Sequence, residues 1–401
     1  MTLWLIVLRS LRQHALSTVI TALSIALAGG LLMSVWTVKE QSHATFTGVN
    51  GGFDAVLGAR GSKLQLVLNA IFHLEASPGN LAWQDYMDIK TNPFVSLAIP
   101  LAVGDNFKGY RLVGTLPELF EKVEYAPGKH YELADGDSFF DPARREAVVG
   151  SFVAQKLGLK PGDEFHPFHG LIYDEKLQHA ATFVVVAVLK PSNTPADRVI
   201  WIPLAGIQKM PGHDPKTATD VSAVLVKLKN PAFGSSLDQM YNKQGNRLTF
   251  AWPVAKTMAD LFDKIAWFDK VLELVAYLVA LVATGSILAS IYNSMNERRR
   301  EIAILRALGA RRRLIFSVIL LEAAAISALG MVIAFFFYGI IMSATAAVIR
   351  SETGVVLDPF QFNAVMLWAP SALITLGALA GIVPALKAYR TDVAEFLAPA
   401  S

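Results

Sequence analysis

Residues 296–313 read NERRREIAILRALGARRR and lie between two long apolar stretches. Asn296 can cap a helix, and Gly309 is a typical C-terminal stop. Apolar side chains recur every three residues between them, which predicts a short amphipathic helix. A need for positive charge would explain the arginines but not an ordered apolar stripe on a loop that faces water. We therefore predict a partner-docking helix whose stripe consists of Ile302, Leu305 and Leu308.

Four stretches are apolar and long enough to cross about 30 Å of hydrocarbon as helices. Hydrophobic residues make up 53% of the 401 residues and charged residues only 17%, which argues against a soluble enzyme. The near balance of 36 basic and 33 acidic residues excludes a general nucleic-acid binder. The first apolar run is too long for a cleaved signal peptide, so we expect it to remain as an anchor. The predicted spans are residues 16–38, 271–293, 316–342 and 364–386.

Lysine and arginine near the span ends predict the orientation, because they favour the cytoplasmic side. Seven arginines lie in residues 294–313, whereas the loop at residues 343–362 contains Arg350 as its only basic residue. Both termini and the 294–313 segment are therefore expected in the cytoplasm, with residues 39–266 and the 343–362 loop outside. The two ends of the chain are predicted to be an interfacial elbow helix, residues 1–15, and a cytoplasmic tail, residues 387–401.

The large insert, residues 39–266, alternates β-type runs with helical patches and predicts an α/β domain. ATFVVVAVL (181–189) and DVSAVLVKL (220–228) are typical of buried strands. DLFDKIAWFDKVLELVAYL (260–278) predicts one continuous helix into the second span, with a stalk at about residues 256–270. An ordinary juxtamembrane helix is the alternative. The stalk face is predicted to consist of Leu261, Ile265, Phe268 and Leu272.

The insert contains one spacing typical of metal ligands, the H-x-x-H pair His166 and His169. A third ligand would have to approach, and Pro167 lies between the two histidines in a segment that leads into a loop. We therefore interpret both as exposed loop histidines and expect no metal site. The absence of cysteine excludes disulfides and thiolate sites, and no Ser/His/Asp arrangement or G-x-S-x-G motif indicates a hydrolase.

The segment RRREIAILRALGA, residues 298–310, resembles the signature of the FtsX/MacB permease family, R-x-x-E-I-x-x-L-R-A-L-G-A before a span with a glutamate. The tail GIVPALKAYRTDVAEFLA is similar to the family's C-terminus, so the FtsX-like domain would cover about residues 271–397. REAVVGSFVAQKLGLKPGDEF resembles the family's periplasmic core. The order of one span, a large insert and three further spans also matches.

The resemblance implies a bacterial inner-membrane protein with four transmembrane helices and a MacB-like periplasmic core domain between helices 1 and 2. Such permeases form homodimers, or heterodimers with a paralogous permease, and work with a cytoplasmic ATPase dimer. Residues 1–401 contain no G-x-x-x-x-G-K-[ST] phosphate loop, so ATP and Mg²⁺ are expected on a separate ATPase and no cofactor on this chain. Membrane lipids and a periplasmic adaptor or lipoprotein are the other expected partners.

By the same resemblance, the chain is a non-catalytic permease of a type VII ABC transporter that exports or extracts an amphipathic substrate, such as a lipoprotein, lipid-like molecule, haem or peptide. Mechanotransmission would begin where the ATPases push on the docking helix. FtsX-like signalling to a cell-wall hydrolase is the alternative, although the large insert favours transport. A membrane-anchored metalloenzyme using His166 and His169 is the third hypothesis. The expected ATPase-coupling residues are Glu297, Arg298, Arg300, Glu301, Ile302, Leu305, Arg306, Leu308 and Gly309.

Three residues inside the spans draw attention. Glu322 lies about two turns into the third span. Acidic residues are rare inside membrane spans and usually have a functional role there. Its depth and its counterpart in the family favour a helix–helix hydrogen bond over proton transport. Gly377 and Gly381 form a small-xxx-small pair that lets helices approach closely, either within the subunit or between two subunits.

Overall fold

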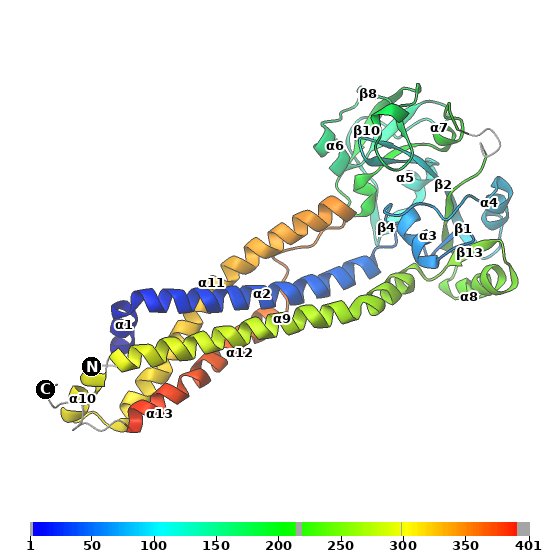
Figure 1. Ribbon diagram of the computed structural model, residues 1–401. Helices are drawn as coiled ribbons and strands as arrows, with labels where there is room; N and C mark the ends of the chain where they lie inside the picture. Colours follow the sequence, from blue (N-terminus) through cyan, green and yellow to red (C-terminus); the bar gives the residue numbers. More distant parts are fainter. Residues whose placement is uncertain (1–2, 214–218, 298, 391–401) are drawn as a thin grey trace. The chain divides into compact units, whose positions relative to one another are not determined.

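The computed structural model describes residues 3–213, 219–297 and 299–390 (Figure 1). The chain divides into two compact units. The helical unit consists of Met1–Gln41, Ala266–Ala347 and Asp358–Ser401, and the α/β unit consists of Ser42–Ile265 and Val348–Leu357.

The described residues include four helical stretches long and apolar enough to cross a membrane, as predicted. The stretches are Ala15–Gly48, Val254–Met295, Arg312–Thr353 and Val365–Tyr389. The helices that form them are α2 (Ala15–Gly48), α9 (Val254–Glu297), α11 (Arg312–Thr353), α12 (Val365–Ala380) and α13 (Ile382–Arg390). Two shorter helices, α1 (Leu3–Gln13) and α10 (Arg299–Ala307), complete the helical unit.

Two of these helices continue past the predicted ends of their spans. α2 extends to Gly48, and α11 extends to Thr353 through much of the predicted 343–362 loop. The added turns of α11, SATAAVIRSET, contain good helix formers and an apolar face. Ile349 on that face packs against the core of the α/β unit, to which residues 348–357 belong. Tertiary packing therefore lengthens the helix beyond its membrane-spanning part.

Glycines allow the helices of the helical unit to pack closely. A Cβ at Gly30 of α2 would lie 2.9 Å from Cβ of Phe337 on α11, and one at Gly330 would lie 2.7 Å from Cβ of Ile25. Both distances are shorter than any normal carbon–carbon contact, so only glycine permits this approach of α2 to α11. The core around the crossing includes the fully buried Ala26.

The α/β unit is built on one mixed sheet of eleven strands. Nine of them follow the order β13-β1-β12-β2-β3-β11-β7-β10-β6, while β8 pairs with β10 and β9 pairs with β2. The pairs β11–β3 and β10–β7 are parallel and the other pairs are antiparallel. The strands are β1 (Ala55–Ala59), β2 (Val95–Phe107), β3 (Tyr110–Thr115), β6 (Leu133–Asp135), β7 (Glu146–Val149), β8 (Glu164–Phe165), β9 (Phe168–His169), β10 (Phe183–Leu189), β11 (Ile200–Pro203), β12 (Ala223–Leu228) and β13 (Leu248–Ala251).

Short helices cover the sheet, and a separate two-stranded ribbon joins β4 (Glu124–Ala126) to β5 (Lys129–His130). The helices are α3 (Lys63–Ala70), α4 (Trp83–Lys90), α5 (Glu118–Lys122), α6 (Ser151–Leu157), α7 (Leu204–Gln208) and α8 (Gly234–Asp238). Successive strand residues enter different cores: Leu112 of β3 lies in one and Val113 in the other. The sheet is therefore buried on both faces, which explains why its strands read as continuous apolar runs.

Strand β2 is the longest in the sheet and carries three other strands. Its first half pairs with β12, and its second half pairs with β3 and β9. Its register with β3 shifts between Val103 and Asp105. The irregularity coincides with the point where β9 joins, so polar residues from distant parts of the chain meet at this end of β2.

Candidate functional site

The predicted docking helix is α10, and it ends at a specific cap. The backbone N–H of Ala310 donates to the carbonyl of Leu305, and that of Gly309 donates to Arg306, each at 3.0 Å. Gly309 has a φ of +97°, in the left-handed region. These two bonds form a Schellman motif, in which glycine at that position avoids a steric cost. The cap holds α10 and the following turn in one defined conformation.

The apolar stripe of α10 divides between two environments. Ile302 packs against the core of the helical unit, whereas Leu308 is 80% exposed and Leu305 42% exposed. Arg306 is half-buried. An exposed leucine pair at the end of a rigidly capped helix is a suitable contact surface for another protein. The remaining predicted contacts, Arg298 and the side chains of Glu297, Arg300 and Glu301, lie outside the described part of the chain.

Three predicted residues from two helices line one small apolar cavity of about 50 Å³ in the helical unit: Ile302 and Leu305 of α10, and Glu322 of α11. Glu322 is buried, and its Oε1 accepts a hydrogen bond from the Ser10 hydroxyl of α1. The geometry therefore supplies the kind of helix–helix hydrogen bond expected for this acid, although its role in coupling stays a prediction. The cavity is also lined by Ile6, Met295 and Leu314.

The glycine pair of α12 faces α11 of the same chain. A Cβ at Gly377 would lie 2.9 Å from Cβ of Ser327, and one at Gly381 would lie 2.8 Å from Cβ of Ala323. These contacts support packing within the subunit, which was one of the two alternatives.

The predicted stalk residues all lie on α9, which continues without a break from Val254 to Glu297. Leu261 packs against the core of the α/β unit. Ile265, Phe268 and Leu272 are 41%, 50% and 37% exposed, respectively. The predicted face is thus mostly uncovered by the described residues of this chain.

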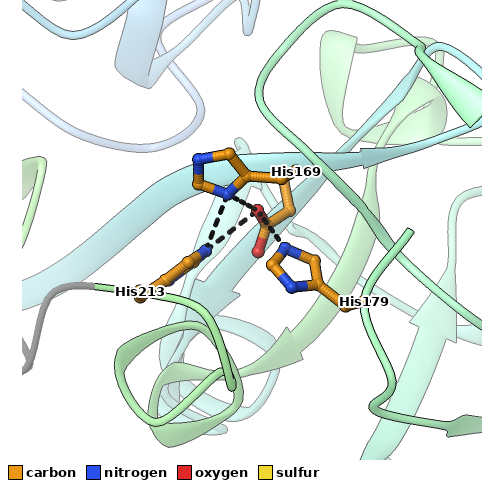
Figure 2. Close-up of side chains that lie close together, drawn as sticks. His169, His179 and His213 are labelled. Atoms are coloured by element: carbon orange, nitrogen blue, oxygen red, sulfur yellow. Dashed lines mark hydrogen bonds and ion pairs between the residues drawn. The ribbon is translucent and has the colours of Figure 1, made fainter. Parts of the chain in front are cut away.

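The two histidines of the H-x-x-H pair are separated in the structure. His166 Nδ1 lies 3.2 Å from the carbonyl oxygen of Ala181, and His166 joins no cluster of metal-type ligands among the described residues. His169 instead lies beside Asp105, His179 and His213 (Figure 2). Figure 2 shows the three imidazoles converging on one point, and all four ligand atoms lie within 4.8 Å of one another. We call this group the His₃Asp cluster.

Four segments of the α/β unit bring this cluster together. Asp105 on β2 is paired with His169 on β9, and a backbone bond from Gly170 N to Gly104 O at 2.9 Å extends the pairing. His179 is positioned by its backbone N–H, which donates to Pro167 O at 2.8 Å. His213 lies in the turn after α7.

The Asp105 carboxylate is completely buried at the centre of the cluster. Its Oδ1 lies 3.1 Å from Nε2 of both His179 and His213, and 3.4 Å from Nδ1 of His169. The hydrogen bond to Asp105 raises the pKa of His213 above its ordinary value, against the opposing effect of burial. No local motif marks Asp105, His179 or His213, because each lies in a different segment. The concentration of histidines in the insert was the only sequence signal.

Two family descriptions match the chain. Residues 15–237 match the MacB-like periplasmic core domain, and residues 273–393 match the FtsX-like permease C-terminal region. The first covers more than half of the 401 residues.

Curated relatives agree with these matches. The chain is 27% identical over 401 aligned residues to the macrolide export ATP-binding/permease protein MacB of Brucella melitensis, covering 96% of this chain and 58% of the relative. It is 30% identical to the pyoverdine export ATP-binding/permease protein PvdT of Pseudomonas syringae pv. tomato, covering 67% of this chain and 39% of the relative. The chain thus spans about half the length of the curated relatives it matches.

Two solved structures also align with it. The periplasmic region of MacB from Actinobacillus actinomycetemcomitans aligns with 53% of this chain and 94% of that structure, at 12% identity and a TM-score of 0.35. The extracellular domain of the noncanonic ABC-type transporter YknZ from Gram-positive bacteria aligns with 49% of this chain and 98% of that structure, at 16% identity and a TM-score of 0.32.

Proposed function

Because the chain belongs to the FtsX/MacB family of ABC transporter permeases, we propose that it is the permease subunit of a type VII transporter driven by a separate ATPase. The proposed substrate is amphipathic, such as a lipoprotein, lipid-like molecule, haem or peptide. ATP and Mg²⁺ bind the ATPase, and this chain moves in response. Two permeases, identical or paralogous, combine with an ATPase dimer in the bacterial inner membrane.

The observation that carries this proposal is the geometry of α10. Its last turn is fixed by the Schellman cap and presents Leu305 and Leu308 to solvent. Ile302, on the same helix, packs against the helical unit. A partner that pushes on the two leucines therefore pushes on the helical unit as well. The arginines around α10 favour the cytoplasmic side of the membrane for this contact surface, where ATP is available.

The length of α9 supports mechanical transmission. With 44 residues it is about 66 Å long, because an α-helix rises about 1.5 Å per residue. Its first turns belong to the α/β unit and its remaining turns to the helical unit. A continuous helix shared in this way resists bending, so movement at its cytoplasmic end is passed outward along the helix.

Co-purification in detergent with a co-expressed ABC ATPase from the same organism tests the proposal. We expect the wild type to retain the ATPase and a Leu305→Asp, Leu308→Asp double variant to lose it, because two carboxylates cannot be buried in an apolar contact. Ile172→Asp is the matched control, since Ile172 is 84% exposed on the α/β unit. Loss of the ATPase in the control as well, or its retention by the double variant, would overturn the docking proposal.

The same complex distinguishes transport from FtsX-like signalling. Transport predicts that amphipathic substrates stimulate ATP hydrolysis by the reconstituted complex. If only a peptidoglycan hydrolase binds and responds to ATP turnover, signalling replaces transport while the docking role of α10 stands.

A further inference from the structure

We propose that Asp105, His169, His179 and His213 form a tetrahedral zinc site in the α/β unit, independent of ATPase coupling. The proposal departs from the expectation that this chain binds no metal. It rests on the ligand set, on the spacing of the ligand atoms and on the hydrogen bonds behind two of the imidazoles.

The spacing of the ligand atoms fits a zinc ion. With Zn–N bonds of about 2.0–2.1 Å, the ligands of a tetrahedral ion lie about 3.3 Å from one another. Asp105 Oδ1 lies 3.1 Å, 3.1 Å and 3.4 Å from the nitrogens of His179, His213 and His169. Nδ1 of His169 is 3.2 Å from Nε2 of His213. These four distances match the separation expected of tetrahedral ligands, and all four ligand atoms lie within 4.8 Å of one another.

The hydrogen bonds behind the ring nitrogens determine which of them carry lone pairs. His179 Nδ1 lies 2.9 Å from the carbonyl oxygen of Pro211, and His213 Nδ1 lies 3.1 Å from that of Ile207. A carbonyl oxygen only accepts, so each Nδ1 carries the hydrogen and each Nε2 of the neutral ring has a lone pair. Zinc-bound histidines are oriented by the same kind of hydrogen bond to a backbone carbonyl.

In the neutral rings, the Nε2 lone pairs of His179 and His213 therefore point at Oδ1 of Asp105, which is itself a hydrogen-bond acceptor. Two acceptors 3.1 Å apart repel each other unless a positive charge lies between them, either the second proton of an imidazolium, which then donates to Asp105, or a metal ion. The other carboxylate oxygen of Asp105 also lacks a partner: Oδ2 is buried and accepts no hydrogen bond from the described residues. A divalent cation satisfies the lone pairs and compensates the buried carboxylate at once.

The ligand chemistry selects the metal. Three imidazole nitrogens and one carboxylate suit zinc, whereas Mg²⁺ and Ca²⁺ prefer sites made of oxygen atoms. An entry path is present, since His169 and His213 line a cavity of about 290 Å³. The side chain of His169 is 52% exposed, while that of His179 is 6% exposed. We therefore assign His169 as the outer ligand, which closes over the ion last.

Zinc binding by the full-length chain in detergent, purified with a histidine-free tag and stripped with EDTA, tests the site. We expect one zinc ion per chain by mass spectrometry and competition with a chromophoric chelator, in the presence of excess Mg²⁺. His169→Gln and His179→Gln should each weaken binding by at least about 100-fold, because loss of a ligand costs more than the 10–100-fold typical of an outer hydrogen-bond partner. His166→Gln, in the same segment but outside the cluster, is the matched control and should bind like wild type.

Thermal unfolding separates a lost site from a lost fold. Without zinc, His169→Gln should unfold at the wild-type temperature, because the side chain is half exposed. Zinc should raise that temperature for wild type and His166→Gln but not for His169→Gln. Cobalt should give the intense visible absorption of a tetrahedral site in the wild type and in His166→Gln, but not in His169→Gln. The proposal fails if the wild type binds no zinc, if both cluster variants bind it as tightly, or if His166→Gln loses as much affinity as His169→Gln.

Discussion

Asp105 and His169 face each other across strands β2 and β9, with Asp105 Oδ1 3.4 Å from His169 Nδ1. They are 64 residues apart in the sequence, so only strand pairing brings them together. The pairing is reinforced by Asn106, whose Nδ2 donates to the carbonyl oxygen of Gly170 at 2.9 Å. Metal affinity in this domain should therefore depend on residues that fix the β2–β9 register as well as on the ligands.

Asn106→Ala tests that dependence. The buried amide also lies 3.3 Å from the carbonyl of Ile172, and without it the segment that carries His169 is held less firmly. We expect about 10-fold weaker zinc binding at unchanged stoichiometry, measured by chelator competition. Asn230→Ala, which removes a local cap elsewhere in the α/β unit, should leave zinc affinity unchanged. An Asn106→Ala variant with wild-type affinity would show that the ligands alone define the site.

The sequence predicted the membrane helices well but did not predict the His₃Asp cluster, for a physical reason. A membrane span can be recognised from about 20 consecutive residues, and the end of α10 can be recognised from a single residue, Gly309. The H-x-x-H pair also looked local, but His166 follows β8, which pairs with β10, whereas His169 lies on β9, which pairs with β2, so the two histidines belong to different parts of the sheet.

The division of the docking stripe has a similar explanation. Ile302 and Leu308 are six residues apart, and at 3.6 residues per turn they differ by about 120° around α10. A repeat of three residues therefore drifts around the helix instead of following one face. One end of the stripe packs inward and the other faces solvent, which the sequence pattern alone did not distinguish.

Glu322→Gln separates a structural role of this acid from proton transport. Glutamine keeps an oxygen that accepts from the Ser10 hydroxyl but cannot exchange a proton at this position. We expect ATPase stimulation by the reconstituted complex to survive in Glu322→Gln. Glu322→Ala should lower the free energy of unfolding by about 1 kcal/mol, because it removes a buried hydrogen bond between two helices. Loss of stimulation in Glu322→Gln, with its thermal stability intact, would point to protonation instead.

Gly377→Ala distinguishes packing within the subunit from packing between subunits. The new Cβ would press on Ser327 of α11, and overpacking of this kind costs about 1–3 kcal/mol. We expect a lower unfolding temperature for the detergent-solubilised chain. Gly285→Ala on α9 is the matched control, because a Cβ there meets no atom within 4 Å. A Gly377→Ala variant that dissociates from its dimer at normal unfolding temperature would favour an intersubunit role.

His73 should make the stability of the α/β unit depend on pH. Its ring is buried against Trp201, with centroids 5.4 Å apart, and its Nδ1 has no hydrogen-bond partner among the described residues. Burial, aided by the positive charge of Arg111, lowers the pKa of His73 from 6.5 to about 3. Above about pH 7.5, one unit above the ordinary pKa of 6.5, the ring is neutral in both folded and unfolded chains, so stability does not depend on it.

As the pH falls below 6.5, His73 becomes protonated in the unfolded chain but stays neutral in the folded chain until about pH 3. The free energy of unfolding therefore decreases across that interval. At pH 5 the loss should be about 2 kcal/mol relative to pH 7. His73→Asn cannot titrate there, and asparagine tolerates the φ of +54° at this position. Urea unfolding of the full chain in detergent at both pH values should therefore show a smaller pH effect in His73→Asn than in wild type. His130→Asn, on an exposed strand, should retain the wild-type effect; equal pH effects in all three proteins would mean that folded His73 accepts a proton readily.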